Sequence, residues 1–395
     1  MTFKYRTLTL GCLAAMGMAG AAHSVELAGG ALEVYGNLYP QYQSTSVSGG
    51  TTSIASSATS MGKVTYAAQP DKTQISSVGS YVGFKGRKAF GDTQVGFDVQ
   101  GVVNIQKSAG AFLSEPRDAY VYISNKNLGR FAMGQMDTAY KSYGDRNRML
   151  GVASSNFVST SGLLSDITWK KASGSGSSSF HTRTENQVSY QTPVYSGVQA
   201  AITTTIDQDA DQASSKTIGA RAIRWSNKEF YASVQQETHN DFRLLSTALT
   251  KSKDTANRIS FGYKKGPWNL ATDFATLEYT QAGLSGSAVK SYKTNTMQVT
   301  AEYALNNNVR LAVNTVRGDA GTCSKVDGSA CLTTGLGGSA VNFGAMYSFD
   351  KNISVFALVG SASANDNAFL ASKAIASTNF GGTVKNMAVG IQAKF

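Results

Sequence analysis

The chain has 395 residues, of which 42% are hydrophobic and only 15% are charged, and its formal net charge is +11. This hydrophobic content excludes a disordered protein. The charged fraction is low, because soluble domains carry about 25% charged residues. A transmembrane helix needs about 20 consecutive apolar residues, and no apolar run after residue 24 exceeds five residues. The composition therefore excludes a helical membrane protein and indicates a large folded chain in an unusual solvent.

The N-terminus has the pattern of a secretory signal peptide. Lys4 and Arg6 give it a basic start, an apolar stretch follows, and Ala22-His23-Ser24 form a small-residue cleavage site. We therefore predict a signal peptide over residues 1–24 and a single mature domain over residues 25–395.

Apolar and polar residues alternate along most of the mature chain. In Gln94–Ile105, for example, Val95, Phe97, Val99, Val103 and Ile105 share one face. Such alternation predicts strands with one apolar and one polar face. The breaks between these segments define sixteen predicted strands, at residues 31–44, 75–86, 92–105, 116–125, 129–137, 182–192, 197–207, 216–226, 229–239, 256–265, 267–280, 292–304, 309–317, 337–349, 353–363 and 384–395.

Alternation fits a soluble β-sandwich as well as a membrane barrel, and three further features favour the barrel. Short connections such as Lys265–Pro267 alternate with long ones such as Thr45–Gln74, as periplasmic turns and outer loops do. The polar faces carry charges such as Asp98 and Arg310, which are costly in a dry core and normal in a water-filled lumen. The chain also ends on an amphipathic strand whose last residue is Phe395. We therefore predict an all-β fold, a transmembrane antiparallel β-barrel of about 16 strands, too wide for side chains to fill.

Four segments carry recognisable motifs. Ser80–Gly86 reads SYVGFKG, Pro116–Tyr143 begins PRDAYVYIS, Arg183–Gly197 reads RTENQVSYQTPVYSG, and the last strand ends in Phe395. These motifs resemble the Gram-negative outer-membrane porins, which are trimeric general diffusion channels of sixteen strands. The resemblance implies passive diffusion of ions and small hydrophilic solutes through each barrel of a homotrimer. It also implies that outer-membrane lipid, lipopolysaccharide and the barrel-assembly machinery, which reads Phe395, are partners, with no cofactor.

The longest predicted loop, at about residues 138–181, is the third outer loop. The resemblance implies that this loop folds into the lumen and forms a constriction. Over residues 136–180 the bases exceed the acids by two, so we expect a weak anion preference. In the alternative, these bases lie on the outer rim and bind lipopolysaccharide phosphates. The expected constriction-loop residues are Asp137, Asp145, Arg146, Arg148 and Asp166.

The expected pore wall keeps two of the basic wall residues of that family and replaces two others. Alternation turns Arg117 inward and its neighbours Tyr120 and Tyr122 outward. The predicted wall consists of the matched Arg117 and Arg183, the replacements Tyr81 and Gln135, and Lys85, Asp98 and Glu185.

Export makes a disulfide possible between the two cysteines that remain once Cys12 is removed with the signal peptide. Because the reducing cytosol is left behind, we predict a local bond between Cys323 and Cys331 in a polar loop, with two free thiols as the alternative.

Two other functions remain open at this point. Tyr35, Tyr39 and Tyr81 alternate toward the lumen and offer a stacking surface, as a channel selective for sugars requires, and selective channels for phosphate or carboxylates belong to the same alternative. An outer-membrane barrel enzyme would need His181 or His239, which we expect to be solvated near outer loops. The sequence has no GxSxG, HExxH or Walker motif, so we predict no enzyme and no metal site. The bases are scattered, which excludes nucleic-acid binding.

Overall fold

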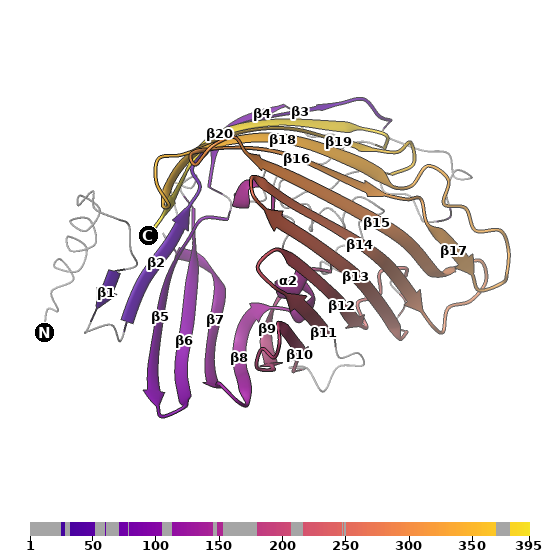
Figure 1. The fold of residues 1–395 in the computed structure, drawn as a ribbon. Coiled ribbons are helices and arrows are strands. Elements are labelled where there is room, and N and C mark those ends of the chain that lie inside the picture. Colours follow the sequence, from indigo (N-terminus) through magenta and orange to yellow (C-terminus); the bar gives the residue numbers. More distant parts are fainter. Residues whose placement is uncertain are drawn as a thin grey trace, which may run out of the picture.

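The computed structural model describes residues 25–27, 32–51, 60, 71–77, 79–104, 113–144, 148–152, 180–206, 216–246, 248, 250–368 and 380–395. Figure 1 shows that these residues form one continuous curved sheet. Within them, no helix has the length and apolar character needed to cross a membrane.

Strands account for nearly all of the secondary structure of the described residues. The helical elements are the short helix α2 (Ala139–Gly144) and the 3-10 helix η2 (Met149–Gly151). The strands are β1 (Val25–Leu27), β2 (Leu32–Leu38), β3 (Gln41–Ser48), β4 (Lys72–Ser76), β5 (Tyr81–Phe90), β6 (Thr93–Val103), β7 (Leu113–Asn125), β8 (Gly129–Asp137), β9 (Arg183–Gln191), β10 (Val198–Thr205), β11 (Thr217–Ser226), β12 (Phe230–Asn240), β13 (Ser252–Lys265), β14 (Trp268–Gln281), β15 (Val289–Ala304), β16 (Val309–Gly318), β17 (Thr322–Lys325), β18 (Gly338–Ser348), β19 (Ile353–Ala364) and β20 (Thr383–Lys394).

Sixteen wall strands close into a barrel. β1 and β17 only extend β2 and β15 at the margins. β2 and β3 form one wall strand that is interrupted at Tyr39 and Pro40, and β4 and β5 form the next, so the twenty strands make sixteen wall strands. Neighbours pair antiparallel, and β20 closes the ring by pairing with both β2 and β3. Closure gives the backbone groups inside hydrocarbon their partners. The predicted fold class is confirmed.

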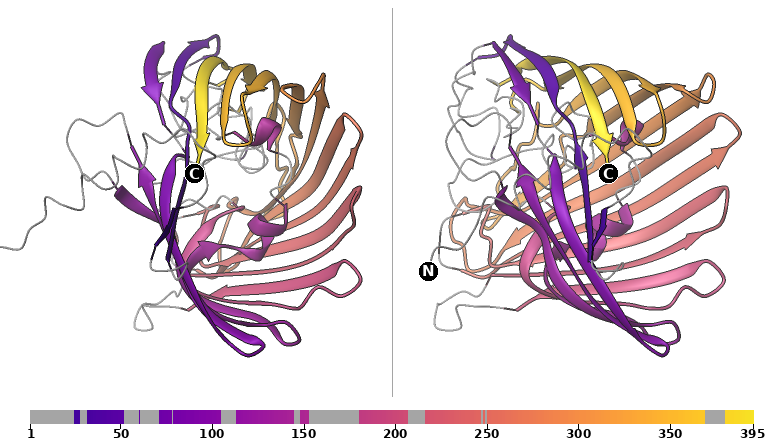
Figure 2. Two further views of the ribbon diagram at one scale, coloured as in Figure 1. Left: turned by 60° about the vertical axis from the view of Figure 1, so that its left-hand side comes forward. Right: turned by 90° about the vertical axis from the view of Figure 1, so that its left-hand side faces the viewer.

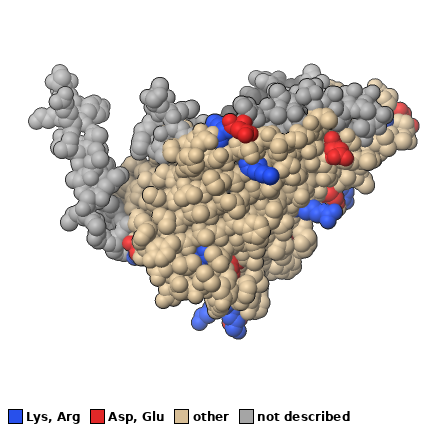
Figure 3. Space-filling model, turned by 90° about the horizontal axis from the view of Figure 1, so that it is seen from above, with Lys and Arg blue, Asp and Glu red and all other residues tan. Residues whose placement is uncertain are grey.

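Each wall strand turns an apolar face outward and a polar face inward. In β13, Ile259 and Phe261 are 44% and 49% exposed, whereas Arg258 and Ser260 are each 1% exposed. On the side of the molecule seen in Figure 3, uncharged residues predominate and charges are sparse. An apolar outer belt of this kind is the surface that a bilayer core accepts.

A bulge in β7 changes the predicted orientation of several side chains. Arg117 and Asp118 together oppose the single residue Gln100 of β6, because the pairing shifts between Val99–Ala119 and Gly101–Pro116. A two-for-one bulge of this kind breaks the strict alternation of faces. Beyond it, Val121 is 53% exposed and faces outward. The prediction that Tyr120 and Tyr122 face lipid is therefore wrong, because they lie on the opposite face from Val121.

Other differences concern strand limits and one more face. β13 begins at Ser252, so the predicted loop at residues 240–255 is shorter than expected. Val103 is 3% exposed, although it was predicted to share the outward face of Val99. The register of β6 against β7 shifts again between Gly101 and Val103, with the extra residue in β7.

Candidate functional site

The described parts of the third long connection, residues 138–144, 148–152 and 180–182, lie against the inside of the barrel wall. β8 leads directly into α2, which contacts β10, β11, β12 and β13 on the inner wall (Figure 2). Tyr140 and Tyr143 of α2 are only 1% and 2% exposed, and they belong to one buried cluster with Leu277 and Tyr279 of β14. The aromatic side chains of α2 thus dock this segment against the wall.

The next described segment of this connection reaches further round the same wall. Met149 and Leu150 are buried in a cluster with Met346 and Leu358, and η2 contacts β15, β16 and β18. The Leu150 amide donates to Oε1 of Glu302 at 2.5 Å. The described parts of the loop therefore lie on the β10–β18 side, and most of the predicted wall residues stand on β5–β9.

A cluster of ion pairs lies where the loop leaves β8. Arg183 of β9 contacts Asp118 Oδ1 through Nε at 2.8 Å and Asp137 Oδ1 through Nη2 at 2.9 Å. Lys141 of α2 contacts Asp137 Oδ1 at 3.0 Å. The cluster joins two neighbouring wall strands, β8 and β9, to the first turn of the loop and to β7. It brings together the predicted residues Arg183 and Asp137 with Asp118 and Lys141, which the sequence did not single out.

Arg117 lies beside this cluster and pairs with none of the acids that the structure describes. Its guanidinium stands 4.7 Å from the centroid of the Tyr81 ring, and Nη1 donates to Gly79 O at 3.4 Å. Among the described residues, Arg117 forms no ion pair. A guanidinium over an aromatic face gains cation–π attraction and keeps its charge. The bulge, and not simple alternation, places Arg117 on the same face as Tyr81.

Lys85, Asp98 and Tyr35 form a second polar group on the wall. Lys85 Nζ pairs with Glu33 Oε1 at 2.8 Å and lies 4.6 Å from the Tyr35 ring centroid. The Tyr35 hydroxyl donates to Asp98 Oδ1 and accepts from Gln100 Nε2 at 2.8 Å. Lys85 and Glu33 offset each other, whereas Asp98 accepts a hydrogen bond from a neutral hydroxyl, so the group of Lys85, Glu33 and Asp98 keeps one net negative charge.

Sequence reasoning missed Arg130. Its guanidinium lies 4.1 Å from the Tyr122 ring centroid and 5.2 Å from that of Tyr120. Since the bulge was not predicted, both tyrosines were assigned to the lipid face and Arg130 had no expected partner. An arginine after a turn glycine gives no sequence signal of its own.

Several predicted site residues are not brought into this arrangement. Gln135 lies opposite Ala119 on the outward face of Met133, and its amide donates to Pro116 O at 2.9 Å, so its assignment to the pore wall is wrong. Glu185 is exposed and forms no ion pair with a described residue. Arg148 is exposed just before η2. The predicted loop residues Asp145, Arg146 and Asp166 lie outside the described residues.

The two histidines differ from expectation. His239 is completely buried and its Nε2 lies 3.0 Å from Oε1 of Glu237, which is equally buried. The Nδ1 atom of His181 lies 3.3 Å from Nη1 of Arg258. The prediction that His239 is solvated near an outer loop is wrong, because the inward-folded loop covers this part of the wall, whereas His181 is half-buried.

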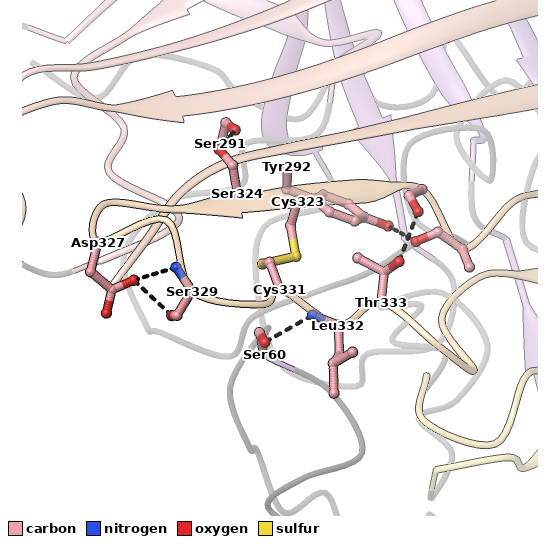
Figure 4. The surroundings of a disulfide bond; sticks show 12 residues. Ser60, Ser291, Tyr292, Cys323, Ser324, Asp327, Ser329, Cys331, Leu332 and Thr333 are labelled. Carbon is pink, nitrogen blue, oxygen red and sulfur yellow. Dashed lines mark hydrogen bonds between the residues drawn. A yellow bond between two sulfur atoms is a disulfide. The ribbon is translucent and has the colours of Figure 1, made fainter. Parts of the chain in front are cut away.

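The outer loop that follows β16 contains a disulfide. Figure 4 shows Cys323 bonded to Cys331, with Cα atoms 5.6 Å apart. Next to it, the Ser60 amide donates to Leu332 O at 2.9 Å, and the Leu332 amide donates to Ser60 Oγ at 3.0 Å. The bonded loop is thereby linked to the first outer loop.

The last residue takes part in barrel closure. Gly36 of β2 donates its amide to Phe395 O at 2.9 Å, and the Phe395 amide donates to Gly36 O at 3.2 Å. The C-terminal residue thus extends the seam between the last and the first wall strand.

Comparison with known proteins agrees with this architecture. A family model described as Gram-negative porin matches residues 10–367. The chain belongs to this family. The porin is localised in the outer membrane, where it forms a channel for the passive diffusion of ions and small hydrophilic solutes.

Solved structures share the fold of this porin at low sequence identity. The anion-selective porin from Comamonas acidovorans is 15% identical with a TM-score of 0.69, covering 92% of this chain and 99% of that one. OmpT of Vibrio cholerae in a trimer form is 14% identical with a TM-score of 0.63 and the same coverage. Salmonella typhi OmpF in complex with daunomycin is 16% identical with a TM-score of 0.59, covering 92% and 97%. No curated protein sequence matches the porin.

Proposed function

We propose that this porin conducts small anions with a weak preference over cations. The observation that carries the proposal is Arg117, an inward base that no described acid pairs with. Charged rings in a channel set the sign of the favoured ion. The similarity in fold to an anion-selective porin agrees with this sign. In the ion-pair cluster and beside it, the bases Arg117, Lys141 and Arg183 exceed the acids Asp118 and Asp137 by one.

Reversal-potential measurement tests the proposal directly. A planar lipid bilayer that contains the purified protein separates two KCl solutions of unequal concentration. The voltage at which the current is zero gives the ratio of chloride to potassium permeability. We expect a ratio above one at low ionic strength that falls toward one in concentrated salt, because salt screens fixed charges. A ratio clearly below one would refute the anion preference.

A second candidate is a channel that selects sugars. The inward rings of Tyr35, Tyr81, Tyr120 and Tyr122 favour it, because aromatic faces stack on sugar rings. Each of these rings already has a base over it or an aromatic ring at its edge, which reduces the free surface. Block of the ion current by a neutral oligosaccharide at millimolar concentration would support this candidate, and an unchanged current would count against it.

We also propose the processing and assembly of the chain. Residues 1–24 act as a signal peptide, and mature barrels form a homotrimer, which the trimer form of the similar Vibrio cholerae OmpT supports. Insertion uses the C-terminal Phe395 as the signal for the barrel-assembly machinery, and the outer wall contacts lipid and lipopolysaccharide. Single-channel recordings should show closure in three equal steps, whereas single independent steps would contradict a trimer.

We infer that the channel has no catalytic role. In the described part of the chain, no group of three or more His, Cys, Asp or Glu residues is arranged to hold a metal ion. The buried contacts of His181 and His239 with Arg258 and Glu237 occupy them structurally. Assay of the purified protein for peptidase and lipase activity tests this, and turnover that His239→Ala abolishes would overturn it.

A further inference from the structure

One buried carboxylate contacts both ends of the constriction loop. Glu237 of β12 is 0% exposed. Its Oε2 accepts a hydrogen bond of 2.5 Å from Thr138 Oγ1, in the first residue after β8. Its Oε1 accepts from the His181 amide at 3.1 Å, two residues before β9. The two described ends of the loop over residues 138–182 are therefore tied to a single side chain on β12, which follows β9 along the wall after β10 and β11.

A third side chain, His239, completes this contact. His239, two residues along β12, places Nε2 3.0 Å from Oε1 of Glu237. A carboxylate has only acceptor sites, so it can accept from both Thr138 and His181, and also from His239 in the tautomer that carries the proton on Nε2. Hydrogen bonds to an ionised acceptor are about twice as strong as neutral ones. Each oxygen of Glu237 thus has a hydrogen-bond donor from the loop.

A buried cation on the next strand holds the same region. Arg258 of β13 is 1% exposed and donates through Nη2 to Tyr140 O, a carbonyl of α2. Its guanidinium carbon lies 4.2 Å from the Tyr140 ring centroid, and Nη1 lies 3.3 Å from Nδ1 of His181. Gly144 leaves room for the Arg258 guanidinium because it has no side chain, and a Cβ there would stand 1.4 Å from Nη2 of Arg258.

We propose that Glu237 and Arg258 are positioning residues that set where the constriction loop stands in the lumen. Neither lines the open channel, because both are covered by the loop that they hold. Their effect on permeation passes through Thr138 and Tyr140. Loss of either contact lets the loop leave the β10–β13 wall, so that the constriction becomes variable in width while the barrel remains closed by its ladder of sixteen strands.

Single-channel recording of Glu237→Gln tests the proposal. Glutamine keeps the shape but has one acceptor oxygen, and its NH2 group faces donors. We expect the open channel to visit additional current levels, with their occupancy raised about tenfold, the factor for one lost hydrogen bond to a charged group. Migration of unheated and heated samples on gels is expected to match the wild type, because the barrel wall is intact.

The matched control is Asp254→Asn. Asp254 of β13 is as deeply buried, at 1% exposed, and it makes no hydrogen bond or ion pair with a described residue of the loop. This variant should keep a single open level. Thr138→Val removes one donor from the loop side and carries the test if Glu237→Gln does not assemble. The variant that combines Glu237→Gln with Thr138→Val should resemble Glu237→Gln alone if both residues act through one contact.

Two results would overturn the proposal. A wild-type single level in both Glu237→Gln and Thr138→Val would show that the contact does not position the loop. Equal extra levels in Asp254→Asn would show that any change of this buried wall has the same effect.

Discussion

Replacing Arg117 by serine is expected to lower the ratio of chloride to potassium permeability. Arg117 is the informative choice because its charge is not offset by an ion pair with a described residue, whereas Arg183 contacts two carboxylates. Serine removes the charge and leaves a small polar side chain. The cation–π contact with Tyr81 is lost too, but it contributes only about 0.5–2 kcal/mol to local order.

The size of the effect follows from Coulomb's law. A unit charge acts on an ion about 4 Å away with about 1 kcal/mol in water-like surroundings. Since about 1.4 kcal/mol corresponds to a factor of ten, the local chloride concentration falls by up to about fivefold. Screening reduces this in concentrated salt, so we expect a change in the permeability ratio of about two- to fivefold at low ionic strength.

The assay compares reversal potentials of three variants in the same salt gradient. Arg117→Lys keeps the charge and should stay near the wild type. Arg221→Ser removes the same charge from the outward face of β11, next to the 50% exposed Ile223, and should change nothing. The double variant Arg117→Ser, Arg183→Ser should move the ratio further toward cations. An unchanged ratio in Arg117→Ser would remove this residue from the conduction path and refute the reasoning.

Three further predictions concern the loops. Burial and the neighbouring Arg258 hold the pKa of His181 well below its usual 6.5, so a released loop takes up a proton that the docked loop does not. Docking of the loop should therefore be unaffected above about pH 6.5 and weaken as the pH falls below it. Open-channel noise that rises as the pH is lowered would show this, and noise that does not depend on pH would contradict it. Replacing Cys323 and Cys331 by serine should cost the outer loop about 2–3 kcal/mol, measured as faster proteolytic cleavage there, with equal rates contradicting it. Gly144→Ala should displace the Arg258 guanidinium and cost about 1–3 kcal/mol, measured as a lower temperature of barrel unfolding, and an unchanged temperature would count against the close contact.

The fold could be predicted from local patterns because each wall strand faces two solvents. Lipid on one side and water on the other impose alternation on every strand, so segments such as Trp268–Gln281 show it without any tertiary information. The alternating short and long connections are equally local. The number of strands, the antiparallel direction of neighbouring strands and the identity of the third loop therefore follow from the sequence.

The details of the site could not be predicted in the same way, because they depend on interruptions of that pattern. The bulge at Arg117 and Asp118 has no sequence mark, yet it decides which way Tyr120 and Tyr122 point and gives Arg130 its partners. Gln135 was misassigned for another reason: the resemblance placed it on the wall, although alternation with Phe131 and Met133 turns it outward.

The sequence by itself determined that this protein is a closed barrel with a long third loop, because alternation and loop length are properties of neighbouring residues. Only the tertiary structure decided what that loop touches. Thr138, His181 and Glu237 are far apart in the chain, and no spacing rule joins them. Their contact exists because the wall curves round to meet the inward-folded loop, and burial there makes a single carboxylate the partner of both loop ends.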